Sequence, residues 1–196
     1  MIMRRGSIDH ILRAAAEVTG QTRFVLVGSA AVIARRKHIP LDMMFTPEID
    51  IYAPDSADIE LTSEMIDGSI GQGSQFRSEF GYYGDGVSPP TSKMPTDWPE
   101  RAIEYRGVEC PGVIAVVPEE NDVALAKLAA WREKDQLWLV EGAKSGVISP
   151  AGMAGRLHLM PEPNSEGNPP PREILLEPYG SSPGARASIF QNSDWP

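Results

Sequence analysis

Two short motifs, which begin at positions 28 and 48, constrain this chain more than any other feature. Residues 28–29 read GS and follow an apolar run, and residues 48–50 read EID inside a second apolar run. The first run, residues 24–27, predicts a short buried strand, and the alanine-rich residues 30–34 predict a helix. Either motif alone is common, because glycine ends many strands and acids line many solvated strand faces. Their occurrence in this order needs a single explanation.

The second motif predicts a metal site. Glu48 and Asp50 are two positions apart in a strand, so their side chains point to one face while Ile49 and Ile51 point into the core. Two carboxylates on one face can share a hard divalent cation such as Mg²⁺ or Mn²⁺. Such a cation prefers oxygen ligands and keeps positions for water and substrate phosphates.

The first motif predicts a phosphate site. Gly28 and Ser29 stand between the predicted strand and the predicted helix, where free backbone amides, a hydroxyl and the positive end of the helix dipole can meet an anion. The absence of a side chain at Gly28 lets a phosphate approach closely. A phosphate site beside a metal site is what a nucleoside triphosphate requires.

The rest of the chain predicts alternating helices and strands, followed by a tail. Beyond Met160 the chain is rich in Pro, Gly, Ser and Asn, so we expect one domain over residues 1–160 and an extended or mobile tail over residues 161–196. Periodicity and end signals predict the following segments: a helix over 8–19 capped by Ser7 and ended by Gly20, a helix over 57–70, a loop-rich segment over 68–90 with one strand, strands over 103–105 and 113–117, one long helix over 119–140, and a short helix from Ser149-Pro150 to near Leu159.

Composition limits the function and the compartment. The net charge is −9, yet residues 1–40 carry 7 Lys or Arg against 2 Asp or Glu. This balance argues against a general nucleic-acid binder but leaves a basic region, including residues 35–37, that can meet a phosphate. Cys110 is the single cysteine, and no apolar run is long enough to cross a bilayer. We therefore expect a cytoplasmic protein without a membrane partner.

The motifs, taken in order, resemble a known superfamily. The succession of helix, strand, GS, helix and EID strand resembles the nucleotidyltransferases, whose core motif is Gly-Ser or Gly-Gly followed by two acids separated by one apolar residue. A second stretch, VALAKLAAWREKDQ at residues 123–136, resembles the lysine-to-aspartate helix motif of the AbiEii-type toxins and related bacterial nucleotidyltransferase-like families. The resemblance spans residues 8–158 and implies an α/β (α+β) fold with a mixed sheet and flanking helices.

The resemblance also implies roles for single residues. Arg132 would lie beside the lysine and aspartate of the helix motif, and a third acid on a later strand would be Glu104 or Glu109. The first acid of the EID motif is a glutamate where the superfamily usually has aspartate. The implied roles are phosphate binding for Gly28 and Ser29, metal binding for Glu48 and Asp50, and catalysis for Lys127 and Asp135, with Lys127 also binding nucleotide.

Two functions follow from the resemblance. In the first, the protein is an Mg²⁺- or Mn²⁺-dependent enzyme that moves a nucleotide from a nucleoside triphosphate to a tRNA or a protein, as the toxin of a toxin–antitoxin or phage-defence pair with an antitoxin partner. In the second, the fold has lost turnover and serves as a nucleotide-binding or partner-binding module. An intact lysine helix favours the first function, and an unfilled third acid position favours the second.

Overall fold

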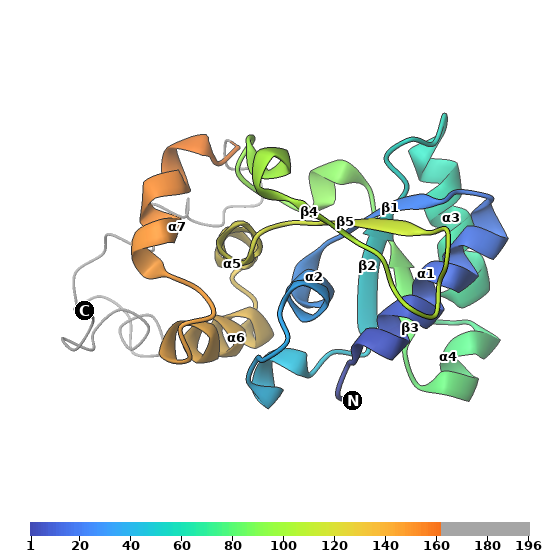
Figure 1. The fold of residues 1–196 in the computed structure, drawn as a ribbon, viewed down its shortest axis with the longest axis horizontal. Helices are drawn as coiled ribbons and strands as arrows, with labels where there is room; N and C mark the ends of the chain where they lie inside the picture. The colour runs from blue at the N-terminus through green and yellow to red at the C-terminus, as the bar shows by residue number, and fades with distance from the viewer. Residues whose placement is uncertain (162–196) are drawn as a thin grey trace.

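The computed structural model describes residues 1–161, and the expected tail over residues 161–196 lies almost entirely outside them. The described chain forms a five-stranded mixed sheet flanked by seven α-helices (Figure 1), so the expected mixed α/β fold is confirmed. The strands are β1 (Arg23–Leu26), β2 (Glu48–Tyr52), β3 (Tyr83–Gly86), β4 (Ile103–Tyr105) and β5 (Ile114–Val117). The helices are α1 (Arg5–Thr19), α2 (Gly28–Arg35), α3 (Ile59–Ile70), α4 (Gln75–Phe80), α5 (Glu120–Ala130), α6 (Glu133–Lys144) and α7 (Pro150–Arg156).

The order of the strands decides which side chains meet at the sheet. The order is β3-β2-β1-β5-β4, with β1 antiparallel to β2 and parallel to β5, and with β2 parallel to β3. Because β1 and β2 run in opposite directions, the end of β1 lies beside the middle of β2, and the Val27 amide donates to the Asp50 carbonyl at 3.0 Å. The GS motif therefore lies next to the EID motif.

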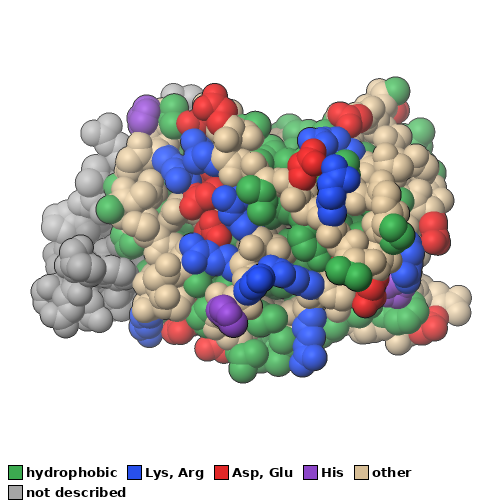
Figure 2. Space-filling model, in the orientation of Figure 1, with side chains coloured by type: hydrophobic (Ala, Val, Ile, Leu, Met, Phe, Trp, Pro, Cys, Tyr) green, Lys and Arg blue, Asp and Glu red, His purple; other side chains and the backbone are tan. Residues whose placement is uncertain are grey.

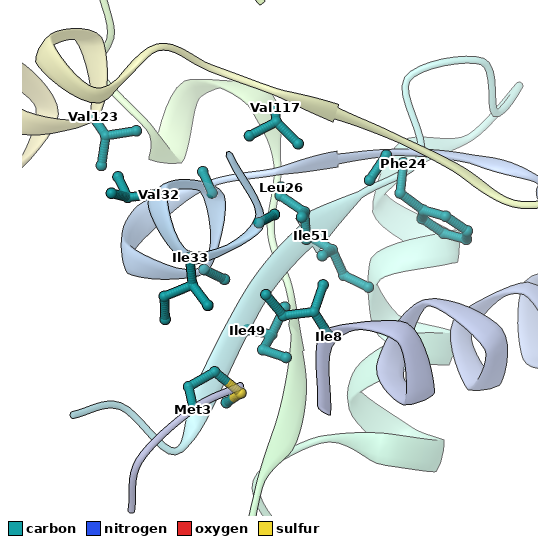
Figure 3. Packing of buried hydrophobic residues seen from close by; sticks show 14 of the residues in the cluster. Met3, Ile8, Phe24, Leu26, Val32, Ile33, Ile49, Ile51, Val117 and Val123 are labelled. Atoms are coloured by element: carbon teal, nitrogen blue, oxygen red, sulfur yellow. The ribbon is translucent and has the colours of Figure 1, made fainter. Parts of the chain in front are cut away.

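The core between the sheet and its helices holds these elements in place. Figure 3 shows Leu26, Ile49 and Ile51 of β1 and β2 packed with Ile8 of α1 and Ile33 of α2. All five side chains are buried. Burial of a side chain of this size contributes roughly 1.5–3 kcal/mol each. The alternation in β2 thus fixes the isoleucines inward and the two acids on the opposite face.

The helices gather at two ends of the sheet. In Figure 1, α1, α3 and α4 lie beside β2 and β3, whereas α5, α6 and α7 lie beyond α2 at the other end. The short 3₁₀ helix Leu41–Met44, called η1 below, packs against both α2 and α6. None of the helices within residues 1–161 combines the length and the apolar character needed to cross a membrane.

Three expectations about local structure are wrong. The first helix begins at Arg5, so Ser7 lies inside it and does not cap it, whereas Gly20 ends it in the left-handed conformation as expected. The loop-rich segment over 68–90 contains the helix α4 as well as the strand β3. The single helix expected over 119–140 is two helices, because Trp131 adopts a left-handed φ of 50° between them.

Candidate active site

A cavity of about 920 Å³ opens where β1 ends and α2 begins, and it brings both sequence motifs together. Its walls come from the first residues of α2, from β2 and β3, and from the facing sides of α5 and α6. Five of the six residues with an implied phosphate, metal or catalytic role line it, namely Gly28, Ser29, Glu48, Asp50 and Lys127, and Arg132 lines it as well. Asp135, the sixth, lies behind this wall and is fully buried.

The conformation of Gly28 allows the two motifs to touch. Its φ of +64° is in the left-handed region, and a Cβ atom placed there would lie 2.8 Å from Oδ2 of Asp50. An alanine would therefore meet both backbone strain and a steric clash. Among residues 1–161, no side chain caps the start of α2, so the amides of its first turn are available to an anion in the cavity.

The cavity also holds an acid that the sequence motifs did not reveal. The register of β2 and β3 places Asp50 directly beside Asp85 on the adjacent strand, and both line the cavity. Within residues 1–161, no hydrogen bond or ion pair reaches either carboxylate. Glu48 differs, because it accepts hydrogen bonds from Lys134 at 2.6 Å and from Tyr83 at 3.0 Å.

The pKa values of these acids reflect their different surroundings. Burial, followed by the nearby charges of Glu48 and Asp85, raises the pKa of Asp50 to about 7. Burial and the charges of Asp67 and Glu48 also raise the pKa of Asp85. Burial acts in the same direction on Glu48, but the hydrogen bonds and charge of Lys134 outweigh it and its pKa lies below the ordinary value. Lys127 and Lys134 offset this effect only in part, and within residues 1–161 no cation is in ion-pair contact with Asp50 or Asp85.

This acid pair fits a divalent cation that also binds substrate. In the described part of the chain, no group of three or more His, Cys, Asp or Glu side chains could by itself hold a metal ion. Mg²⁺, however, is usually held by one or two carboxylates, with waters and substrate phosphates completing its shell. Asp50, with Glu48 or Asp85 beside it, supplies that number of ligands next to the open amides of Ser29.

The break between α5 and α6 brings a lysine and an aspartate together. In one continuous helix, Lys127 and Asp135 would be roughly 12 Å apart along the axis. The turn at Trp131 instead places Nζ of Lys127 2.9 Å from Oδ1 of Asp135. Arg132 donates to the other carboxylate oxygen at 2.6 Å. The helix motif is therefore a connected group of charges.

The group carries its charges in an almost buried position. The Asp135 side chain has no exposed surface, and that of Lys127 is 10% exposed. Burial lowers the pKa of Lys127, against the opposing charge of Asp135. Burial acts to raise the pKa of Asp135, but hydrogen bonds from Arg132 and Lys127 leave it below the ordinary value. Asp135 thus orients the lysine that lines the cavity.

Neither acid suggested for the third position lies in the cavity. Glu104 is on β4, at the opposite edge of the sheet from β3, and pairs with Arg23 at 2.9 Å. Glu109 lies in the loop before β5, where its amide donates to Asp9. Asp85 was missed because GYYGDG resembles a loop and only strand order brings it beside Asp50. Lys134 was also missed, although its place in the EKDQ run was a usable signal.

Comparison with known proteins agrees with this geometry. Residues 7–158 match the model of a family described as "nucleotidyltransferase of unknown function (DUF6036)". No curated protein and no solved structure matches the chain. The matched segment covers α2, β2, β3 and both helices that carry the lysine and aspartate. The chain therefore belongs to this family of nucleotidyltransferases.

Proposed function

We propose that the protein transfers a nucleotide from a nucleoside triphosphate to a hydroxyl group of an RNA, such as tRNA, or of a protein. One observation carries this proposal: the unpaired carboxylates of Asp50 and Asp85 lie beside the open start of α2, in a cavity that also contains Lys127. In the described part of the chain, these two acids have no ion-pair partner and the helix start has no side-chain cap, which favours a ligand that brings both a cation and phosphates.

The backbone amides, the lysine and the acids of the cavity each have a role in the transfer. The amides of Gly28 and Ser29 bind triphosphate oxygens, and Lys127 stabilises negative charge as pyrophosphate leaves. A divalent cation such as Mg²⁺ or Mn²⁺ at Glu48 and Asp50 neutralises triphosphate charge when it is bound. The acceptor hydroxyl oxygen forms a bond to the α-phosphorus, the bond from that phosphorus to the bridging oxygen breaks, and pyrophosphate and a proton are released.

A transfer assay tests this function directly. The full chain is incubated with Mg²⁺, with each of the four α-³²P-labelled nucleoside triphosphates in turn, and with total tRNA or total protein. We expect label to appear in one acceptor class with the wild type and not with Asp50→Asn. Asp55→Asn removes a carboxylate that is 66% exposed and outside the cavity, so it serves as the matched control. Equal labelling by the Asp50→Asn variant would refute the proposal.

The same assay separates catalysis from binding alone. A protein that binds Mg²⁺ and nucleotide but labels no acceptor is the nucleotide-binding or partner-binding module. The presence of the lysine, the acids and the glycine in one cavity supports transfer over that alternative.

The toxin role is a separate part of the proposal. It is supported by the likeness of residues 123–136 to the AbiEii-type helix motif. Expression in a bacterial host should arrest growth, and Asp50→Asn should restore growth at an equal protein level. Wild-type expression without any growth defect would contradict the toxin role and leave the transfer activity to be judged by the labelling assay.

A further inference from the structure

A second cavity, of about 590 Å³, lies at the opposite end of α2 and is strongly basic. Figure 2 shows Lys and Arg side chains and a His gathered over this part of the molecule, near the N-terminus and the end of α2 in Figure 1. The charged and titratable residues that line it are Arg4, Arg5, Arg36, Lys37 and His38. The protein as a whole has a net charge of −9, so this local concentration of positive charge has the opposite sign to the net charge.

Within residues 1–161, two of the four cations in this basic cavity have no counter-charge in ion-pair contact. Arg36 pairs with Glu120 at 2.6 Å, and Arg5 donates to the carbonyl of Ile33 at 3.2 Å, so both have structural roles. Arg4 and Lys37 are exposed, and residues 1–161 offer them no ion pair or side-chain hydrogen bond. The ion pair with Glu120 accounts for Arg36, but no contact within residues 1–161 accounts for Arg4 and Lys37, which come from separate segments.

The segment η1 connects the basic cavity to the active-site cavity. Met44 lines the basic cavity and Phe45 lines the active-site cavity. The N-terminal residues hold this segment, because the Met3 amide donates to the Met44 carbonyl at 2.9 Å and Ile2 forms a β-bridge with Phe45. The eight residues of α2 separate the cavities by roughly 12 Å. A ligand that reaches both must be an extended chain.

An exposed aromatic ring stands on this connection. Phe45 is 59% exposed, although apolar side chains of its size are usually buried. The ring lies between a cavity of cations and a cavity with a phosphate site. Proteins that bind single-stranded nucleic acids use this arrangement. Cations follow their backbone and an aromatic ring stacks on a base. An acidic protein segment would use the cations but would have no need of the ring.

We infer that the basic cavity and Phe45 bind a single-stranded RNA whose end enters the active-site cavity as the acceptor. Arg4 and Lys37 bind backbone phosphates, Phe45 stacks on a base near the end of the strand, and the terminal ribose lies beside the bound nucleotide. The identification of this RNA as the acceptor rests on the proposed nucleotidyl transfer, whereas the binding surface itself does not.

Fluorescence anisotropy with a labelled 12-nucleotide single-stranded RNA tests the surface. We expect Arg4→Glu and Lys37→Glu each to raise the Kd about tenfold and to reduce the slope of log Kd against log salt by about 0.7, the value for one single-strand phosphate contact. Arg106→Glu makes the same charge change at an exposed arginine outside both cavities, and should raise the Kd much less. Equal effects of the three variants would overturn the inference.

Two further arms identify the ligand class. Phe45→Leu should weaken RNA binding while Phe45→Trp retains it, because stacking needs a ring; equal loss in both would refute stacking. A glutamate peptide of the same charge as the RNA should compete poorly, and competition as strong as that of unlabelled RNA would show a general anion surface and overturn the inference.

The inference and the proposed function fail in different ways. Isothermal titration of Mg²⁺ with a nonhydrolysable nucleoside triphosphate should give the same Kd for the wild type, Arg4→Glu and Lys37→Glu. A protein that labels a protein acceptor but binds no RNA would refute the inference and keep the proposed transfer. RNA binding that depends on Lys37, in a protein that binds no nucleotide, would refute the transfer and keep the RNA surface.

Discussion

Lys127 and Asp135 form a buried ion pair of 2.9 Å across the break between two helices. The pair exists because Trp131 turns the chain, so the partners approach from α5 and α6 and not along one helix. Removing the partner of a buried charge lowers the stability of the fold. The cost differs between the two residues of this pair. Asp135 keeps a second partner in Arg132, whereas the described structure gives Lys127 no other carboxylate within an ion-pair distance.

The first prediction concerns stability. Asp135→Asn should lower the free energy of unfolding by about 3 kcal/mol, because the buried Lys127 charge loses its counter-charge. Lys127→Met should cost less, since Asp135 remains bonded to Arg132. Urea unfolding followed by circular dichroism gives both values. A larger cost for Lys127→Met than for Asp135→Asn would contradict the unequal pairing.

The second prediction concerns catalysis by the same lysine. Lys127→Ala should abolish transfer of labelled nucleotide, because the ammonium stabilises the charge of the leaving pyrophosphate. Asp135→Ala should reduce transfer less, since its role is to orient the lysine. Circular dichroism must first show that each variant is folded. Full transfer by a folded Lys127→Ala variant would show that the helix motif is structural.

The third prediction is a pH dependence of stability set by Asp50. The pKa of this acid is about 7 in the folded protein and near 3.8 without the fold. Between these values only the folded state holds the proton, so stability decreases as pH rises from about 4 to 7 and stays low above. In EDTA, Asp50→Asn should therefore be roughly 4 kcal/mol more stable than the wild type at pH 8.

The comparison of the two proteins at pH 4 provides a check on this third prediction. The difference in unfolding free energy should almost vanish there. At this pH Asp50 is largely protonated in the folded state, so its side chain is neutral, as the asparagine side chain is at every pH. Asp55→Asn controls for the general loss of one acid, since Asp55 lies on the surface. A stability difference that does not change between pH 4 and pH 8 would show that Asp50 does not titrate in this range.

The fourth prediction uses matched glycines. Gly28→Ala should lose about 1–2 kcal/mol of stability from its left-handed backbone and should also weaken binding of Mg²⁺ with nucleoside triphosphate. Gly20 has a similar φ of +71° with open space around it, so Gly20→Ala carries the strain without the clash. Titration calorimetry should show a weaker ligand affinity for Gly28→Ala only. Equal affinities would mean that the close approach to Asp50 is unimportant.

The fifth prediction is ligand stabilisation. Mg²⁺ and a nucleoside triphosphate together should raise the unfolding temperature, because a ligand at 100 times its Kd adds about 2.7 kcal/mol to the folded state. Asp85→Asn should reduce this increase, since Asp85 lies beside Asp50 in the cavity. Differential scanning fluorimetry at millimolar metal and nucleotide measures the shift. An undiminished shift in Asp85→Asn would leave the metal site to Glu48 and Asp50 alone.

The sequence predicted those features of the fold and the site that depend on residues close together along the chain. Alternation placed Ile49 inward and the EID acids outward, and the glycine-serine step correctly marked the start of α2. These features depend on neighbours along the chain, and a single sequence contains them. The proximity of the two motifs also depends on the antiparallel pairing of β1 with β2, which is a long-range contact.

Features that depend on distant packing were not predictable. Asp85 becomes part of the cavity only through the parallel pairing of β3 with β2. The turn at Trp131 interrupts a run rich in alanine and leucine that favours a continuous helix. Tertiary contacts, including the buried pair of Lys127 and Asp135, outweigh that local preference. Asp85 and the pair of Lys127 and Asp135 therefore lie where local propensity and the final structure disagree.

The position of β3 at the margin of the sheet has a dynamic consequence. Edge strands open more readily than central ones, and β3 has a strand partner on one side only. Opening of β3 would remove Asp85 from Asp50 while β1, β5 and the core stay folded. A ligand that joins the two carboxylates must therefore slow amide hydrogen exchange in β3 more than in β1. Binding of a ligand would then slow amide hydrogen exchange in β3, while the exchange rate in the centre of the sheet stays unchanged.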